Sequence, residues 1–313
     1  MPEYRALRAK NSMLDAINTP DLAAEITLQP MKAFGFDAAI IFSDILPPLK
    51  GMGLNLDFVK GVGPRLDNPV RSRTDIDRLS TPSMAQVMSG TLEAIRIVKR
   101  ELGSRPLIGF SGAPFTLASY AIEGGGSKSY THAKGLMYSD PEGWHSLMDK
   151  LSAVVEDYLT QQALAGADVL QIFDSWAGAV GQLDYEKFVA PYTRRVVAAA
   201  TKTGKPVINF STGTSGHLPS VASTGGDVIG VDFRTPIDRA WSEIGNGFGI
   251  QGNLDPVLLQ APWPTLKAGA QDVLRRAAGQ AGHIFNVGHG ILPETPVDNV
   301  RRLVDFVHEQ SAR

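Results

Sequence analysis

A carboxylate ends one of the most apolar segments of the chain. In AAIIFSDILPP, residues 38–48, five apolar residues are followed by Ser43 and Asp44. A carboxylate at this point can accept backbone hydrogen bonds in the turn before the two prolines, or it can face a ligand and stabilise positive charge. If residues 38–44 form a strand that ends at a binding site, we expect the second role, with an N–H donor or a cation as the partner of Asp44.

Two further apolar segments are followed by residues that could do chemistry. In NVGHGI, residues 286–291, His289 lies between two glycines, where it either ties down its own loop or faces a ligand. In FDSWAG, residues 173–178, Ser175 follows Asp174, although serine and aspartate are also common caps of helices. No G-x-S-x-G motif surrounds Ser175, so a serine hydrolase has little support.

A glycine run follows a tyrosine in SYAIEGGGSKSY, residues 119–130. The spacing of this run to Lys128 is not that of the phosphate-binding loop G-x-x-x-x-G-K-[ST]. Tyr120 either offers its phenol to a ligand or packs in the wall of a site. The six histidines lack a ligand spacing such as H-E-x-x-H, and the chain has no cysteine, so no metal site is predicted.

Composition restricts the class of protein. The chain has 313 residues, a formal net charge of -2 and a pI near 6.3. The chain therefore lacks the excess of Lys and Arg over Asp and Glu that is typical of nucleic-acid-binding proteins. No apolar run approaches the roughly 18 residues of a membrane span, and residues 1–13 do not resemble a secretory signal. We therefore expect a cytoplasmic protein that binds neither nucleic acid nor a membrane.

Short apolar segments alternate with helical patterns over the whole length, which is typical of parallel strands covered by helices. Seven such segments predict strands: AAIIFSD (38–44), PLIGFSG (106–112), DVLQIFDS (168–175), PVINFS (206–211), DVIGVDF (227–233), GIQGN (249–253) and HIFNVGHG (283–290). Each ends in a polar or glycine-containing turn. The side chains that could do chemistry are therefore expected at the carboxyl ends of the strands.

Two architectures place ligands beyond the carboxyl ends of parallel strands, an open doubly wound sheet and a closed (β/α)8 barrel. Seven recurrent units without a second domain fit a barrel that lacks one unit better than a six-stranded open sheet. Residues 1–36 indicate a helix and a connection with no strand ahead of them. The sequence thus predicts an α/β fold, a (β/α)8 TIM barrel with its first strand missing, as one domain over residues 1–313.

Two helices are predicted most clearly. In SMAQVMSGTLEAIRIVKRELG, residues 83–103, apolar residues recur at three- and four-residue steps, which predicts one helix that stops at Gly103. Asp140 and Pro141 suit the N-cap and the first position of the next helix. Asp255, which also precedes a proline, is interpreted as a structural cap in the same way.

Six segments together resemble the uroporphyrinogen decarboxylase family, in order and over almost the whole chain. They are PEYRALR (2–8), LQPMKAFGFDAAIIFSDIL (28–46), FSGAPFTLASYAIEGGGSK (110–128), LQIFDSWAG (170–178), QGNLDP (251–256) and NVGHGI (286–291). The resemblance implies a (β/α)8 barrel that forms a homodimer. It also implies a carboxy-lyase of haem biosynthesis that needs no metal or cofactor and converts uroporphyrinogen III into coproporphyrinogen III by removing carbon dioxide from its four acetate side chains.

The resemblance also implies roles for four residues. The aspartate of the family motif F-S-D-I-L corresponds to Asp44, the tyrosine before the glycine run to Tyr120, the serine of F-[DE]-S to Ser175, and the histidine of G-H-G to His289. All four are expected to line the substrate pocket. Asp44 is further expected to be catalytic, by accepting hydrogen bonds from the pyrrole N–H groups and stabilising the cationic intermediate.

The chain departs from the family pattern at its beginning. Family members carry an arginine-rich strand of the form R-Q-A-G-R-Y ahead of the P-E-Y-R segment, and those arginines have no counterpart here, although Arg5 and Arg8 are present. We therefore expect a chain that is incomplete at its N-terminus.

Three other functions are considered. A non-catalytic tetrapyrrole-binding remnant would retain Asp44 and His289. A methyltransferase of the same superfamily is disfavoured because its zinc site uses cysteine. An unrelated sugar-phosphate barrel would bind phosphate near the last two strands.

Overall fold

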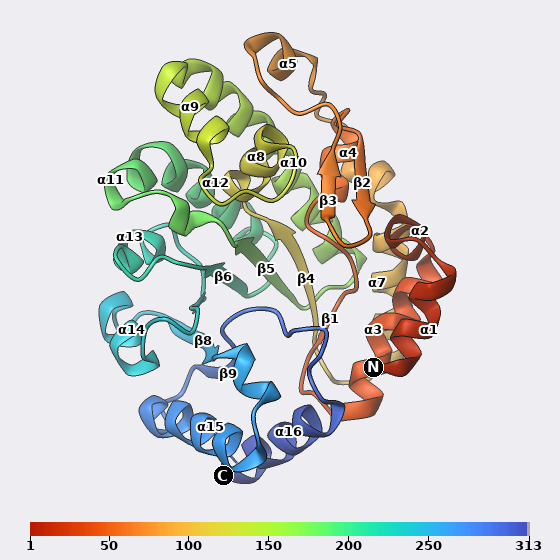
Figure 1. Cartoon of the computed structure of the whole chain (residues 1–313), viewed down its shortest axis with the longest axis vertical. Coiled ribbons are helices and arrows are strands. Elements are labelled where there is room, and N and C mark those ends of the chain that lie inside the picture. The colour runs from red at the N-terminus through yellow and green to blue at the C-terminus, as the bar shows by residue number, and fades with distance from the viewer. Residues whose placement is uncertain (312–313) are drawn as a thin grey trace.

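The computed structural model describes residues 1–311 and is built around one parallel sheet (Figure 1). Its seven strands lie in the order in which they occur in the chain, and every neighbouring pair is parallel. The strands are β1 (Ala39–Ile40), β4 (Leu107–Gly112), β5 (Val169–Asp174), β6 (Val207–Ser211), β7 (Val228–Gly230), β8 (Gly249–Leu254) and β9 (His283–Val287). Each overlaps its predicted segment, so all seven predicted strands are confirmed.

Helices connect the strands and cover one face of the sheet (Figure 1). Those before β4 are α1 (Pro2–Lys10), α2 (Met13–Asn18), α3 (Pro20–Phe34), α4 (Pro47–Gly51), α5 (Arg73–Arg78), α6 (Met84–Val87) and α7 (Ser89–Glu101). Those between β4 and β6 are α8 (Pro114–Glu123), α9 (Thr131–Ser139), α10 (Pro141–Ala165), η1 (Ala177–Ala179), α11 (Gln182–Asp184), η2 (Tyr185–Val189) and α12 (Ala190–Thr201). The remaining ones are α13 (Leu218–Ala222), α14 (Ile237–Ile244), η3 (Pro256–Gln260), α15 (Trp263–Ala277) and α16 (Val297–Ser311).

The register of the strands separates a helix-covered face from an inner face. Gly109 of β4 lies against Gln162 of α10, whose amide bonds both the N–H and the carbonyl of Phe110 at 2.8 Å. The side chains of its neighbours along the strand, such as Phe110, point to the opposite, inner face of the sheet. On that inner face Phe173 of β5 contacts Phe110 and Phe210 edge to face, each at 5.5 Å between ring centroids. These rings give the curled sheet an apolar inner surface.

The apolar side chains on the helix-covered face form two clusters. The larger cluster packs β4, β5 and β6 against α7, α8, α10 and α12, with Trp144 of α10 fully buried. The smaller packs β7, β8 and β9 against α14, α15 and α16, and it includes Phe34 of α3. Because α3 precedes β1 and α16 follows β9, this second cluster joins the two ends of the helical layer.

The helical layer is thus continuous where the sheet is not. Within residues 1–311, β1 and β9 are the two ends of the sheet order and are not paired with each other. Figure 1 shows the segment between β9 and α16 extending towards the N-terminal helices, and Arg5 of α1 donates to the Pro293 carbonyl of that segment at 2.8 Å. The predicted fold of the TIM-barrel type is confirmed as a curled sheet of seven strands that is open between β1 and β9.

Some local predictions need correction. The single helix expected over residues 83–103 is two helices, α6 and α7, separated at Met88. Two antiparallel strands, β2 (Leu56–Val59) and β3 (Gly63–Leu66), form a hairpin that was not predicted. The caps at Asp140 and Asp255 are confirmed, since each side chain accepts a backbone N–H of the helix that follows.

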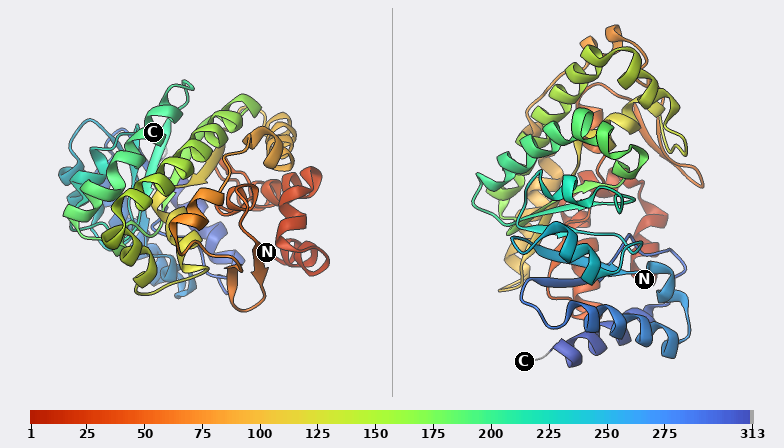
Figure 2. Two further views of the ribbon diagram at one scale, coloured as in Figure 1. Left: turned by 90° about the horizontal axis from the view of Figure 1, so that it is seen from above. Right: turned by 90° about the vertical axis from the view of Figure 1, so that its left-hand side faces the viewer.

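Figure 2 shows α5 and α9 at one end of the long axis of the molecule and α15 and α16 at the other.

Candidate functional site

Asp44 lies in the turn that leads from β1 to α4. Its Oδ1 accepts the backbone N–H of Leu46 at 2.9 Å, so the turn interaction considered for this carboxylate is present. The side chain is also partly buried, and this burial raises the pKa of Asp44 against the opposing effect of backbone N–H donors. Within residues 1–311 no Lys, Arg or His lies within salt-bridge distance of it. The carboxyl group is therefore oriented by backbone N–H donors and has no cationic partner among the described residues.

Tyr120 of α8 is close enough to Asp44 for its titration to depend on that carboxylate. Burial, the charge of Asp44 and Tyr130 together raise the pKa of Tyr120 to about 12. The phenol is therefore neutral at ordinary pH and can donate a hydrogen bond. Its ring stacks on Trp176 with centroids 3.8 Å apart, and Tyr130 meets the same indole edge to face at 5.0 Å. Tyr120 thus lies in an aromatic cluster and within electrostatic range of Asp44.

The end of β5 holds Trp176 in this cluster. The hydroxyl of Thr116 on α8 donates to Asp174 Oδ1 at 2.7 Å and accepts the backbone N–H of Trp176 at 3.2 Å. Asp174 is buried on the helix-covered face, and burial raises its pKa to about 7. Ser175 follows directly, and its carbonyl accepts the hydroxyl of Thr212 at 2.6 Å. The turn after β5 is therefore fixed to both α8 and the turn after β6.

The turns after β6 and β7 continue this arrangement. Gly178 and Gly213 approach so closely that a Cβ on Gly178 would lie 2.6 Å from the Cα of Gly213, which requires glycine there. The N–H of Gly213 donates to Asp232 Oδ2 at 2.6 Å. The same carboxylate accepts the backbone N–H of Arg234 at 2.9 Å and its guanidinium at 2.5 Å. A hydrogen-bonded series of turns therefore reaches from β5 to β7.

Arg234 is a functional candidate that was not singled out from the sequence. Its side chain is 52% exposed, and its guanidinium lies over the ring of Phe233 at 4.8 Å. The available signal was the arginine two positions after Asp232 at the end of a predicted strand, which the sequence does not distinguish from a surface charge. Its position became apparent only from the shared contact of Asp232 with the turn after β6.

His289 lies in the turn after β9 and is exposed. Its Nδ1 accepts the backbone N–H of Gly290 at 2.7 Å, which is the loop-fixing role considered for this histidine. The preceding Gly288 packs directly on the backbone of Phe233, so the β9 and β7 turns are in contact. Within residues 1–311 no hydrogen bond or ring contact joins His289 to Asp44, Tyr120 or Ser175. Of the four predicted residues, Asp44 and Tyr120 are linked by an electrostatic effect of the carboxylate on the phenol.

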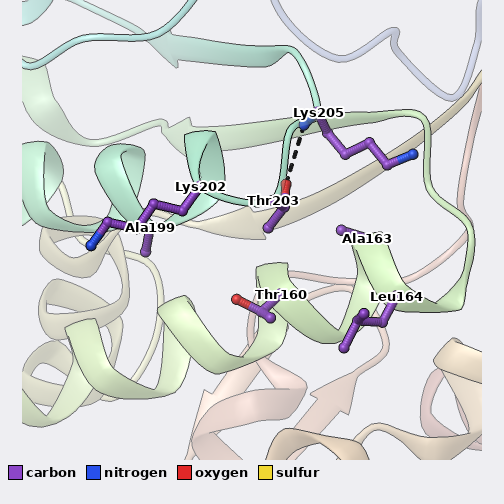
Figure 3. Close-up of a pocket in the computed structure, with 7 residues that line it drawn as sticks. All are labelled: Thr160, Ala163, Leu164, Ala199, Lys202, Thr203 and Lys205. Carbon is purple, nitrogen blue, oxygen red and sulfur yellow. Dashed lines mark hydrogen bonds between the residues drawn. The ribbon is translucent and has the colours of Figure 1, made fainter.

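A surface hollow elsewhere in the molecule is separate from these turns. It has a volume of about 680 Å³ and lies between α10 and α12 (Figure 3). Its lining residues are Thr160, Ala163, Leu164, Ala199, Lys202, Thr203 and Lys205. Because Lys205 precedes β6, this hollow lies at the end where the strands begin, opposite the end that carries Asp44.

Neither a cluster of metal ligands nor a membrane-spanning helix is present in residues 1–311. No group of three or more His, Asp or Glu side chains is arranged so that it could hold a metal ion in this part of the chain. In the same residues no helix is long and apolar enough to cross a bilayer.

Comparisons with known proteins agree along nearly the entire chain. Residues 1–310 match the model of a family described as "Uroporphyrinogen decarboxylase (URO-D)". A uroporphyrinogen decarboxylase of Roseiflexus sp. is 53% identical over 100% of this chain and 91% of its own length. One from Chloroflexus aurantiacus is also 53% identical, over 98% and 88%. Among solved structures, a methyltransferase from Methanosarcina mazei has a TM-score of 0.84 at 21% identity, over 98% of this chain and 91% of its own, which is a likeness of fold.

Proposed function

The chain belongs to the uroporphyrinogen decarboxylase family, and we propose that Asp44 is its catalytic carboxylate. The protein is a carboxy-lyase of tetrapyrrole biosynthesis, which converts uroporphyrinogen into coproporphyrinogen by removing carbon dioxide from acetate side chains. We further propose that Tyr120, Ser175 and His289 bind this substrate at the carboxyl ends of β4, β5 and β9. The observation that carries the assignment is a partly buried carboxylate at the end of β1, without a cationic partner in residues 1–311.

The chemistry requires an electron sink, and the pyrrole ring can be one. A proton added to a ring carbon makes the ring cationic. The bond between the acetate methylene and its carboxylate then breaks, carbon dioxide leaves, and the electron pair neutralises the ring. A proton taken up by the methylene carbon and loss of the ring proton leave a methyl group. One proton is therefore consumed for each carbon dioxide released.

Asp44 is suited to stabilise the cation formed in this sequence. An ionised carboxylate near the pyrrole N–H groups accepts their hydrogen bonds and offsets positive charge as it develops. Its interaction is strengthened where water is excluded, and the donor at Leu46 already fixes its orientation before substrate binds. The neutral phenol of Tyr120, which lies within electrostatic range of Asp44, adds a hydrogen-bond donor to the site without adding charge. This is electrostatic preorganisation for a cation rather than an oxyanion.

The experiment that tests this function is an anaerobic incubation of the purified chain with uroporphyrinogen, followed by chromatography of the oxidised porphyrins. We expect coproporphyrin to accumulate through partly decarboxylated intermediates. Binding of uroporphyrin, followed by quenching of tryptophan fluorescence, is measured in parallel. Binding without any loss of acetate carboxyl groups would contradict the proposal and identify a non-catalytic tetrapyrrole binder.

We also propose that the protein is a cytoplasmic homodimer in which residues 1–313 form one domain. The support is the family resemblance and, for the compartment, a chain without cysteine. Sedimentation equilibrium is expected to give twice the 33.6 kDa mass of one chain. A single species at the mass of one chain would contradict the dimer.

A further inference from the structure

Arg234 stands at the carboxyl end of β7, four places from β1 in the order of the sheet. The Asp232 carboxylate holds one terminal nitrogen of the guanidinium at 2.5 Å, and the ring of Phe233 lies under its plane. Within residues 1–311 the hydrogen bonds of this guanidinium run through that one nitrogen. A guanidinium has five N–H donors, so most of them have no acceptor among these residues, and the side chain is 52% exposed. The guanidinium is thus positioned by Asp232 and Phe233, and its remaining edge is accessible to a ligand.

The support of Arg234 is itself well fixed. Asp232 is buried, and its carboxylate also accepts the N–H groups of Gly213 and Arg234, which tie it to the turn after β6. A buried carboxylate so bound orients the guanidinium and reduces the entropy that an arginine normally loses when it binds a ligand. A bidentate carboxylate is the ligand whose geometry matches the open edge of a guanidinium.

We propose that Arg234 binds a substrate carboxylate other than the one being removed, an inference that rests on the proposed function. An acetate about to lose carbon dioxide must not be paired with a guanidinium, because that pairing stabilises the ground state more than the neutral product. A position remote from Asp44 in the sheet avoids this conflict. Each acetate must in turn be free to reach Asp44, whereas the propionate side chains stay intact throughout the reaction. The propionates are therefore the ligands of Arg234, and this residue sets the orientation of the tetrapyrrole.

The test compares Arg234→Gln and Arg234→Lys with wild type in the full chain. Loss of one charge-assisted, bidentate contact corresponds to about tenfold in binding. We expect Arg234→Gln to raise KM for uroporphyrinogen about tenfold while kcat changes less than twofold. Arg234→Lys is expected to recover part of the loss, since lysine keeps the charge but not the fork. Arg239→Gln is the matched control, because Arg239 is exposed on α14 and pairs with Glu243.

Equilibrium binding measurements answer two questions. They show whether Arg234 binds the substrate or only stabilises the fold, and whether its ligand is a propionate or an acetate. The Kd values of uroporphyrin and of coproporphyrin are measured by tryptophan quenching, and thermal unfolding is recorded for each variant. We expect Arg234→Gln to weaken both porphyrins by the same factor, because both retain propionates. An effect on uroporphyrin alone would overturn the propionate assignment. Unchanged KM and Kd in an active background, or a loss of kcat with lowered thermal stability and unchanged Kd, would overturn the binding role.

These outcomes are distinct from failure of the proposed function. If wild type binds porphyrins but releases no carbon dioxide, the decarboxylase proposal fails while the Kd comparison still decides the role of Arg234. If wild type is active and Arg234→Gln matches the Arg239→Gln control, only the inference on Arg234 fails.

Discussion

The turns after β1 and β9 flank the same opening of the sheet, yet their polar residues have different surroundings. Asp44 is partly buried, its pKa is raised by burial, and its charge acts on Tyr120. His289 is exposed, and its Nδ1 is already satisfied by the N–H of the next residue. The residue type alone marks both as functional candidates. On the basis of this difference in burial, we propose the catalytic role for the β1 side and a lesser, substrate-binding role for the β9 side.

Replacing Asp44 by asparagine is expected to have the largest effect. Asparagine keeps the size of the side chain and an acceptor for the Leu46 N–H but removes the negative charge. Because the proposed role of the charge is to stabilise a cationic intermediate, kcat for uroporphyrinogen should fall by about 10²-fold or more. A rate of carbon dioxide release near that of wild type would remove Asp44 from the mechanism. It would also show that Asp44 and His289 do not differ in role as proposed.

Substitutions of Tyr120 are expected to lower activity less than Asp44→Asn does. Two variants separate the contribution of the hydroxyl from that of the ring. Tyr120→Phe keeps the stack on Trp176 and loses one hydrogen-bond donor, which corresponds to about fivefold in kcat/KM. Tyr120→Leu also removes the stack and should cost more. The measurement is steady-state kinetics of both variants. Equal kinetics for the two would show that the ring does not matter, and wild-type kinetics for both would remove Tyr120 from the site.

The exposed His289 should tolerate change better than either residue on the β1 side. His289→Asn keeps a polar side chain that can bond the N–H of Gly290, so the turn is expected to persist. We expect KM to rise a few-fold, about the contribution of one exposed hydrogen bond, with kcat nearly unchanged. A loss of kcat comparable with that of Asp44→Asn would contradict the division of roles between the two turns.

Asp174 gives a prediction on stability rather than on rate. Its pKa is raised from 3.8 to about 7, so the folded state binds a proton that the unfolded state has lost over that interval. The contribution of this group to stability therefore declines as pH rises from about 4 to 7 and is constant above that. Urea unfolding of wild type and Asp174→Asn should show a free-energy difference that shifts in favour of the variant over this range. A difference independent of pH would contradict the raised pKa.

The sequence predicted the positions of the strands well because parallel strands covered by helices are short, apolar and bounded by polar turns. Asp44 and Tyr120 could be expected at one end of the sheet on the same ground. The division into α6 and α7 was not predictable from periodicity, since Met84 and Met88 fit one continuous helix. Nor was the β2–β3 hairpin, whose strands include Gly63 and Pro64, both poor strand formers.

The parts of the site that were missed depend on contacts between distant turns. Arg234 is one charged residue among many in the sequence, and the hydrogen bonds of Asp232 to Gly213 and to Arg234 show that it lies beside the turn after β6. Likewise, the support of Trp176 by Thr116 joins residues 60 positions apart. The exposure of His289 depends on how the turn after β9 packs, because a glycine-flanked histidine can equally be buried against a ligand.

The pH dependence of kcat/KM for uroporphyrinogen tests the central role of Asp44 most directly. Its carboxylate must be ionised to stabilise the cation, and burial raises its pKa from 3.8. We expect wild-type activity to fall as pH is lowered through a pKa above 3.8, and this decline to be absent from the residual activity of Asp44→Asn. The same decline in both proteins would show that the titrating group is another residue and would remove the proposed role of Asp44.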